Sequence, residues 1–403
     1  MFLDTALQRN PALITTAVCL HREARLPSNC YVIDLDTVTA NATLLKDRAR
    51  SLGLRWYFMS KQFGRDPTVL RAIIDPGSRQ VVAVEAQEAR QLHAQRIPIG
   101  HVGHLGQVPF ADMAAVLAME PEVMTVFGSA QAAVAGKALG PGKSQAVLLR
   151  VWAEGDIFFP LHRGGIPEHD VLHAAEAIQA VPGIRVAGVT SFPCLSYSGA
   201  GRPRLTTNMV TIMRSAERLR QSGFEIEQIN APGNTSVEAM EAVARAGATH
   251  VEPGHALTGT TVWHAVEELP ERPAMIYLSE VAHLHNGRAF VLGGGLYLDQ
   301  VTPPEQPTRC LFGTSAEALL QHRGRLEQGA DLRGIDYYGV VVPEDGQVQV
   351  GDSVVFAFRA QVFATRAYVA LLAGLESRRP WVVSVLDRSL RPVPGFPPDP
   401  PRP

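Results

Sequence analysis

From Leu54 to Pro253, short runs of apolar and β-branched residues alternate with stretches in which apolar residues recur every three or four positions. The first pattern is typical of buried strands, and the second is typical of helices with one buried face. Repeated alternation of the two indicates parallel strands joined by right-handed crossovers. The predicted strands cover residues 55–60, 81–84, 97–103, 123–128, 146–152, 185–192, 224–230 and 249–253.

Eight such strands within about 200 residues favour an α/β fold of the closed (β/α)8, TIM-barrel type. The competing fold is an open doubly wound sheet, but no Gly-x-Gly-x-x-Gly turn follows any of the strands. We therefore expect the barrel over residues 30–265. The segment 29–38 precedes the first barrel strand and is followed by a helix from about residue 39 to 52, and it could be a strand that joins the C-terminal β-domain from the N-terminal side.

The pattern changes after the predicted barrel, where strand-like segments are separated by glycine or charged turns. In the segment 347–354, valines alternate with polar residues, as in a half-exposed antiparallel sheet. We expect a C-terminal antiparallel β-domain over residues 266–390, to which residues 1–29 could contribute. The proline-rich end, residues 391–403, is expected to be disordered because proline supports neither helices nor sheet ladders.

Composition narrows the function classes. The chain is 46% hydrophobic and 19% charged with a net charge of -2, which is ordinary for a globular protein and argues against a nucleic-acid surface. The first ten residues lack the pattern of a signal peptide, and no apolar stretch is long enough to span a bilayer. The four cysteines form no Cys-x-x-Cys pair. These observations favour a cytoplasmic protein that does not bind membranes.

Lysine is rare in this chain. Only four of the 37 basic residues are lysines, namely Lys46, Lys61, Lys137 and Lys143. Lys61 ends the first predicted barrel strand, and the carboxyl ends of barrel strands carry the chemistry of this fold. Arginine can supply surface charge equally well, but lysine can form an imine with an aldehyde and arginine cannot.

The loops after strands seven and eight contain glycine, hydroxyl and amide residues. A phosphate held between these two loops is a recurring arrangement in (β/α)8 barrels. The alternative is that Thr235 or Ser236 serves only as a helix N-cap. The predicted phosphate-binding residues are Gly233, Asn234, Thr235, Ser236, Gly254, His255 and Thr258.

A lysine on strand one, Glu252 on strand eight and a phosphate site together match the chemistry of pyridoxal 5'-phosphate. The lysine binds the aldehyde, and a carboxylate that faces the pyridine nitrogen keeps that nitrogen protonated. Two simpler readings remain open. Lys61 could extend to solvent at a strand end, and Glu252 could pair with Arg150, a cofactor-binding candidate on strand five.

The order of motifs resembles the alanine racemase and ornithine decarboxylase group of pyridoxal phosphate enzymes over roughly residues 30 to 265. "FMSKQFG" takes the place of the strand with the cofactor lysine, "HRGGI" resembles the loop after strand five, and "APGNTS" resembles the phosphate loop. "EPGHALTG" has the decarboxylase form, with Glu252 where alanine racemases have arginine. Ser191 stands where racemases place a histidine against the ring. The end of the chain resembles the YhfX-like branch.

The resemblance implies an enzyme that acts at the α-carbon of an amino acid, first of all a racemase, in a homodimer with shared active sites. Lys61 would be one base, bound as an imine at rest, and the second base would come from the β-domain of the partner subunit. Candidates are Tyr297, Tyr337 and Tyr338, although each could be a packing residue. The sequence pattern does not identify which amino acid is the substrate.

Other readings stay open. A decarboxylase would use the same cofactor, but the loop 310–315 lacks the Cys-Asp pair of decarboxylases. A pyridoxal phosphate-binding protein without turnover is the third reading, and the β-domain argues against it. His101 and His104 could suggest a metal, but the His-x-Cys pair of metal-dependent relatives is absent, so no metal is expected.

Overall fold

The computed structural model describes residues 2–197, 202–298, 307–329 and 335–400. By its internal contacts the chain divides into two units. The unit that we call the barrel unit consists of Thr43–Ser60 and Leu70–Gly254. The unit that we call the β-domain unit consists of Met1–Ala42, Lys61–Val69 and His255–Pro403.

The barrel unit contains one parallel sheet, whose strands pair in the order β2-β13-β12-β9-β7-β6-β5-β4-β3. The short β8 (Ile166–Pro167) adds to β7, and β10 (Leu195–Ser196) pairs with β11 (Arg204–Leu205). The strands of the main sheet are β2 (Arg55–Trp56), β3 (Phe58–Met59), β4 (Val81–Ala83), β5 (Ile99–Val102), β6 (Val123–Val126), β7 (Gln145–Trp152), β9 (Ile184–Thr190), β12 (Gln228–Asn230) and β13 (His250–Val251).

The sheet closes on itself through residues 55–59, which include both β2 and β3. On one side of this segment, the Tyr57 N–H donates to the Val251 carbonyl at 3.0 Å. On the other side, the Phe58 N–H donates to the Gln80 carbonyl at 2.7 Å. The same extended segment is therefore the first strand of an eight-stranded barrel, and the predicted (β/α)8 fold is confirmed.

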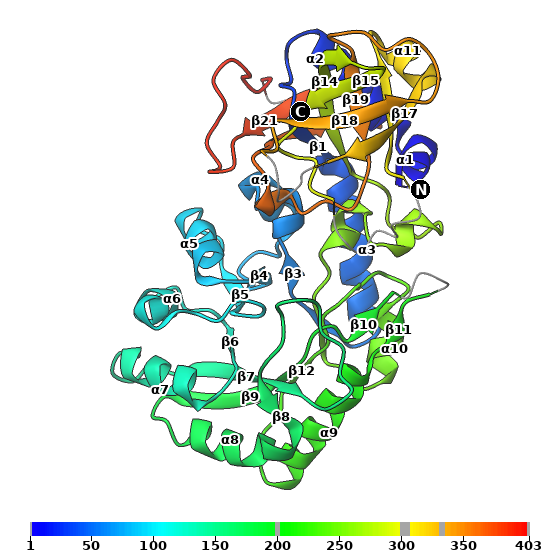
Figure 1. Ribbon diagram of the computed structural model, residues 1–403. Helices are drawn as coiled ribbons and strands as arrows, with labels where there is room; N and C mark the ends of the chain where they lie inside the picture. The colour runs from blue at the N-terminus through cyan, green and yellow to red at the C-terminus, as the bar shows by residue number, and fades with distance from the viewer. Residues whose placement is uncertain (1, 198–201, 299–306, 330–334, 401–403) are drawn as a thin grey trace. The chain divides into compact units, whose positions relative to one another are not determined.

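Helices follow the strands and lie around the outside of the parallel strands, as Figure 1 shows for α5 to α9. The helix after strand seven begins at Met240, later than its apolar pattern predicts, because residues 237–239 form a turn. The helices are α3 (Leu35–Ser51), α4 (Pro67–Ile73), α5 (Ala86–Ala94), α6 (Met113–Leu117), α7 (Ser129–Ala138), α8 (Val171–Gln179), α9 (Thr207–Gln221) and α10 (Met240–Arg245).

The β-domain unit is built on antiparallel strands, apart from the parallel pairing of β1 with β20. Six of them, in the order β14-β15-β18-β17-β16-β19, close because β19 also pairs with β14. The strands β1, β20 and β21 extend this sheet from β14. The strands are β1 (Cys30–Asp34), β14 (Met275–His285), β15 (Arg288–Leu292), β16 (Arg309–Gly313), β17 (Arg323–Gln328), β18 (Tyr338–Pro343), β19 (Ser353–Phe356), β20 (Tyr368–Ala373) and β21 (Trp381–Leu386).

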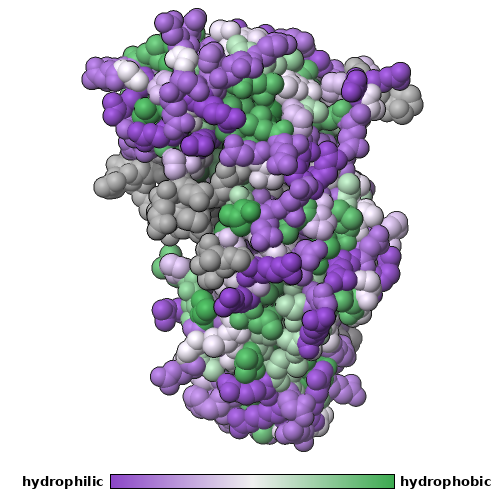
Figure 2. All heavy atoms as spheres, turned by 90° about the vertical axis from the view of Figure 1, so that its right-hand side faces the viewer, coloured by the Kyte–Doolittle hydropathy of each residue, from purple (hydrophilic) through white to green (hydrophobic). Residues whose placement is uncertain are grey.

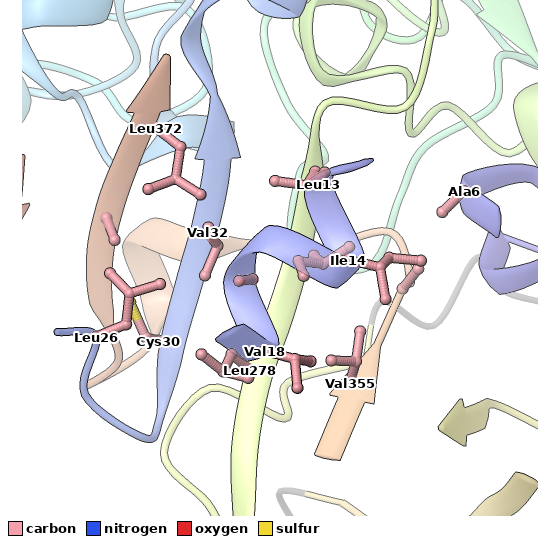
Figure 3. Packing of buried hydrophobic residues seen from close by; sticks show 14 of the residues in the cluster. Ala6, Leu13, Ile14, Val18, Leu26, Cys30, Val32, Leu278, Val355 and Leu372 are labelled. Atoms are coloured by element: carbon pink, nitrogen blue, oxygen red, sulfur yellow. The ribbon is translucent and has the colours of Figure 1, made fainter. Parts of the chain in front are cut away.

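The N-terminal segment is part of the β-domain unit. Its strand β1 pairs with β14 and β20, so residues 30–34 join the antiparallel sheet, which differs from the range 30–265 expected for the barrel. The helices α1 (Phe2–Arg9), α2 (Pro11–Arg22) and α11 (Ala316–Gln321) cover this sheet. Figure 3 shows Ile14 and Val18 of α2 packed among side chains of β1, β14, β19 and β20.

The proline-rich end was expected to be disordered, but residues 391–400 follow a defined path along β21. The Val393 N–H donates to the Val385 carbonyl at 3.0 Å, and the Asp399 N–H donates to the Val382 carbonyl at 2.8 Å. Asp399 also forms an ion pair with Arg25, with a shortest distance of 2.5 Å. Proline lacks the N–H group that a β-ladder needs, but Val393 and Asp399 between the prolines still donate backbone hydrogen bonds, and Asp399 supplies a negative charge.

No helix within the described residues is long and apolar enough to cross a membrane. On the face shown in Figure 2, hydrophilic residues surround smaller apolar patches. Scattered apolar residues of this kind are normal on the surface of a folded chain.

Candidate active site

Glu252 follows β13 directly, and its buried carboxylate is held by side chains from other strands. His101 Nδ1 lies 2.6 Å from Glu252 Oε1, and the Asn230 amide donates to the same oxygen at 2.8 Å. His101 belongs to β5, and Asn230 is the last residue of β12. Three strands therefore place polar side chains together at the carboxyl end of the barrel, where chemistry is expected in this fold.

These contacts keep Glu252 ionised. Burial by itself raises the pKa of a carboxyl group, because an apolar surrounding disfavours the charged form. For Glu252 the charges of His104 and His101, together with the hydrogen bonds from His101 and Asn230, outweigh burial and lower the pKa to about 2. The site therefore contains a carboxylate at neutral pH, although no water reaches it.

The second oxygen of this carboxylate is buried near a histidine but accepts no hydrogen bond in the described part of the chain. Glu252 Oε2 has no hydrogen-bond partner among the described residues, and His104 Nε2 lies 3.5 Å from it. A buried acceptor without a donor is uncommon in folded proteins, so this oxygen suits a donor on a bound group.

The same side chains could also hold a metal ion, because ligand atoms of His101, His104 and Glu252 lie within 4.8 Å of one another. However, both ring nitrogens of His101 already have partners, since Nε2 lies 2.6 Å from Thr125 Oγ1. A ligand to a metal would need one of these lone pairs. The expected absence of a metal stays a prediction.

Arg150 on β7 is a buried cation, only 1% exposed. Its Nη2 donates to the carbonyls of His162 at 3.2 Å and Phe192 at 3.4 Å, and its guanidinium lies 5.4 Å from the Phe127 ring centroid. Its Nε and Nη1 have no hydrogen-bond partner among the described residues. Burial lowers the pKa of Arg150 to about 10, which still leaves it charged at neutral pH.

The pairing of Arg150 with Glu252, considered from the sequence, is not what the structure has. The guanidinium contacts backbone carbonyls, and the carboxylate is taken by His101 and Asn230. Each ion therefore keeps polar atoms that can bind another molecule. A buried guanidinium that touches only neutral groups favours an anionic oxygen.

Ser191, directly after β9, accepts a hydrogen bond of 3.1 Å from the Asn208 amide of α9. Phe192, the next residue, contacts the His104 ring edge to face, with 5.6 Å between centroids. An aromatic side chain, that of Phe192, therefore lies next to Ser191.

The loop after β12 turns sharply. Gly233 has a φ of 126°, and a Cβ atom there would lie 2.9 Å from the Leu195 carbonyl, so only glycine fits without a shift. The Asn234 amide donates to the same carbonyl at 3.3 Å, which ties the loop to β10. Thr235 donates to the Gly233 carbonyl, and the Ser236 hydroxyl accepts from the Ala239 N–H at 3.3 Å. The Ser236 hydroxyl thus caps the turn that precedes α10.

Lys61 is the first residue of the 3-10 helix η1 (Lys61–Phe63), which belongs to the β-domain unit. Its ammonium group lies 5.1 Å from the Phe363 ring centroid, within the range of a cation–π contact. The preceding residue, Ser60, belongs to the barrel unit and donates to the buried Glu88 carboxylate at 3.0 Å. The end of the barrel strand that leads to Lys61 is therefore fixed by a buried acid.

His255 and Thr258 form the 3-10 helix η4 (His255–Thr258) of the β-domain unit, directly after Gly254 of the barrel unit. Burial lowers the pKa of His255 well below its usual range, and the charges of Arg359 and Lys61 lower it further. His255 is therefore neutral, in a positively charged part of this unit. The Thr258 hydroxyl donates to the His255 carbonyl at 3.2 Å.

The three candidate tyrosines lie in the β-domain unit and are exposed. Tyr337 is 60% exposed, and its ring lies 5.4 Å from the Arg366 guanidinium. Tyr338 contacts the His283 ring at 4.9 Å between centroids. Tyr297 is 42% exposed. None of them is a core packing residue, so their hydroxyl groups can meet another molecule.

Several residues of the site escaped the sequence analysis. The sequence indicates His101 and His104 only as residues on the third strand and as possible metal ligands, and it does not single out Asn230 or Thr125. The one available signal was position, since His101 and Asn230 lie at carboxyl ends of predicted strands. Which of these side chains meet Glu252 depends on rotamers that no pattern encodes.

Comparison with known proteins agrees with this fold. Residues 33–262 match the family described as "Alanine racemase, N-terminal domain", and residues 276–382 match "YhfX-like, C-terminal domain". The chain is 34% identical over 389 residues to the "Uncharacterized protein YhfX" of Escherichia coli (strain K12), covering 96% of this chain and 98% of that one.

Solved structures with the same fold are far less similar in sequence. D-threonine aldolase from Filomicrobium marinum is 17% identical with a TM-score of 0.65, covering 91% of this chain and 96% of its own. D-threo-3-hydroxyaspartate dehydratase from Delftia sp. HT23 is 18% identical with a TM-score of 0.63, covering 87% and 95%. Alanine racemase of Clostridium difficile 630 is 15% identical with a TM-score of 0.62, covering 89% and 98%.

The alanine racemase-like fold family binds pyridoxal 5'-phosphate, so the cofactor predicted from the sequence is confirmed at this level. The chain belongs to the YhfX-like family, which joins an alanine racemase N-terminal domain to a C-terminal β-domain of its own type.

Proposed function

We propose that this protein is a pyridoxal phosphate-dependent enzyme that acts at the α-carbon of an amino acid, first of all as a racemase. The observation that carries the proposal is the carboxylate of Glu252, which is buried and ionised and has one oxygen that accepts no hydrogen bond among the described residues. When bound, pyridoxal phosphate withdraws electrons from the α-carbon of an amino acid, and a protonated ring nitrogen strengthens this effect.

The polar atoms of the barrel unit fit the cofactor. Glu252 Oε2 is an acceptor for the protonated ring nitrogen, and Arg150 Nε and Nη1 are donors for an anionic oxygen. Ser191 adds a hydroxyl group beside them. For the phosphate group we propose the loop Gly233, Asn234, Thr235 and Ser236 together with Gly254, His255 and Thr258.

Lys61 is the residue that we propose to bind the cofactor's aldehyde carbon. Lys61 directly follows the strand that closes the barrel. Once released from the cofactor, its amine can take a proton from one face of the α-carbon or return a proton to it.

A racemase needs a second base on the opposite face. We propose Tyr297, Tyr337 or Tyr338 for this role, supplied by a second copy of the chain in a homodimer. Their exposure supports this assignment, because an exposed hydroxyl group can reach a partner's site.

A decarboxylase is the second candidate. The observation that favours it is the same acid on strand eight, since a strongly electron-withdrawing cofactor also stabilises the carbanion that remains when CO2 leaves. A binding protein without turnover is the third. Pairing Glu252 with a ring nitrogen serves bond breaking rather than storage, which favours the two enzymes.

The first test maps the lysine. Purified protein is incubated with pyridoxal phosphate, reduced with borohydride and digested, and the modified peptide is identified by mass. We expect modification of Lys61 alone, and its loss in Lys61→Ala but not in Lys137→Ala. Modification of another lysine would remove the site assignment.

The second test follows the reaction with single L-amino acids in D2O. Deuterium at the α-carbon together with loss of optical rotation supports the racemase, and CO2 release supports the decarboxylase. Bound cofactor with neither reaction for any amino acid would contradict the proposal and support the binding protein.

A further inference from the structure

Thr125, His101 and Glu252 form a chain of side chains inside the barrel. Thr125 Oγ1 lies 2.6 Å from His101 Nε2, and His101 Nδ1 lies 2.6 Å from Glu252 Oε1. In the closed sheet, β5 and β13 are separated by β4 and the segment 55–59. The contact between His101 and Glu252 therefore crosses the barrel interior.

These three hydrogen-bonded side chains set the orientation of the Glu252 carboxylate. His101 and Asn230 both occupy Oε1, so rotation of the carboxylate would break two hydrogen bonds in a place that water does not reach. Thr125 in turn fixes the ring of His101, because it holds the other nitrogen. A partner behind a functional group commonly sets its orientation in this manner.

We propose that His101 is a positioning residue, supported by Thr125, which holds the Glu252 carboxylate so that Oε2 alone is presented to the ring nitrogen of the cofactor. This inference rests on the proposed function. It assigns His101 to orientation rather than to a metal, because both of its ring nitrogens are engaged by side chains.

The chain offers a matched control. His250 is also buried in the barrel, and its Nδ1 lies 2.8 Å from Thr249 Oγ1. Its ring stacks on Tyr57, with 5.4 Å between centroids, and no hydrogen bond joins it to Glu252 among the described residues. His250→Gln therefore removes a buried imidazole that makes no hydrogen bond to the Glu252 carboxylate and feels it only through its charge.

The experiment uses the full chain loaded with pyridoxal phosphate labelled with 15N in the ring. The 15N chemical shift reports whether the ring nitrogen carries a proton, independently of turnover. The variants are His101→Leu, His101→Gln, Thr125→Val and the control His250→Gln. Borohydride mapping in each variant shows whether the cofactor is still attached to Lys61.

In the wild type and in His250→Gln we expect a protonated ring nitrogen. In His101→Leu we expect the signal of an unprotonated nitrogen with the cofactor still on Lys61, and exchange of the α-hydrogen slower by about 10- to 100-fold. His101→Gln should restore the wild-type signal, since its amide can donate to Glu252. In Thr125→Val the 15N signal should shift in the same direction as in His101→Leu. Thr125→Val serves as the deciding variant if His101→Leu does not fold.

Wild-type 15N shifts in both His101→Leu and Thr125→Val would overturn the positioning role and leave the proposed function intact. A transition-metal ion bound at one per chain in the wild type and lost in His101→Leu would also overturn it. Failure of the wild type to bind the cofactor at Lys61 would overturn the proposed function, and the inference with it.

Discussion

Asn230 and Glu252 lie at the ends of neighbouring parallel strands, and the Asn230 amide donates a hydrogen bond of 2.8 Å to Glu252 Oε1. The amide thus supplies a neutral donor to a buried carboxylate. An acid at position 230 would have nearly the same shape but would place two negative charges side by side.

For this reason Asn230→Asp should destabilise the barrel, by about 3 kcal/mol at pH 8. Two adjacent carboxylates share a proton, so one of them has a raised pKa in the folded state. A raised pKa gives stability at low pH that is lost as the pH rises. The melting temperature of Asn230→Asp should therefore approach that of the wild type at pH 5 and fall below it at pH 8.

The control is Asn286→Asp, because Asn286 lies in an exposed turn between β14 and β15. It should leave the melting temperature nearly unchanged at both pH values. Equal losses in the two variants would mean that Asn230 has no special relationship with Glu252.

Gly165 should be required for the position of Arg150. It has a φ of 123°, and a Cβ atom there would lie 2.5 Å from the Arg150 carbonyl and 2.7 Å from Arg150 Cγ. Gly165→Ala should therefore displace the guanidinium and weaken the binding of pyridoxal phosphate by about tenfold or more, measured by titration of the absorption band.

Gly155→Ala is the matched control for this variant. Gly155 also has a positive φ, 85°, but a Cβ atom there meets no atom within 4 Å. It shares the backbone strain without the clash, so its affinity for the cofactor should stay close to that of the wild type. If both variants lost the same affinity for pyridoxal phosphate, backbone strain rather than displacement of Arg150 would explain the effect.

The barrel was predictable from the sequence because its strands are buried on both faces and therefore appear as short continuous apolar runs. The same property left the role of residues 30–34 open between the barrel and the β-domain. Their run is apolar throughout and all five are buried, so the pattern does not distinguish a parallel barrel strand from a strand of the antiparallel sheet. Only the pairing of β1 with β14 and β20 decides this.

The candidate site was predictable in part. The positions of Lys61 and Glu252 at the carboxyl ends of barrel strands could be predicted, because these ends can be counted along the chain, and their roles stay predictions. The partners of Glu252 could not be predicted, since His101 reaches it across the interior rather than from a neighbouring strand. Charge complementarity suggested Arg150, but the geometry of the side chains selected His101.

His21 should make the β-domain unit less stable in acid. It lies on α2 between the hydroxyl groups of Ser353, at 2.8 Å, and Ser28, at 2.9 Å. Burial, followed by the charge of Arg22, lowers the pKa of His21 to about 4. Glu280 lies 3.6 Å away and opposes this shift, but it is 37% exposed, so its charge is screened and burial prevails.

With a native pKa near 4 and an unfolded value near 6.5, the unfolded chain binds the extra proton between these values. Stability is then fully present above pH 6.5 and is lost as the pH falls toward 4. Between pH 7 and pH 4 the wild type should lose about 3 kcal/mol more than His21→Gln, measured by urea unfolding. Parallel pH curves for the two proteins would contradict the assignment.

Ile14 tests whether the N-terminal helices belong to the core of the β-domain unit. It is fully buried on α2 and packs in one cluster with Val32, Leu278 and Val355 (Figure 3). Ile14→Ala removes buried methyl and methylene groups and leaves a cavity, so it should lower the free energy of unfolding by about 3 kcal/mol. Leu284→Ala changes a side chain that is 46% exposed in the same unit, and it should cost less than about 1 kcal/mol. If both variants unfold at the same urea concentration as the wild type, α2 contributes little to the core, and the N-terminal helices are an appendage to the antiparallel sheet rather than part of it.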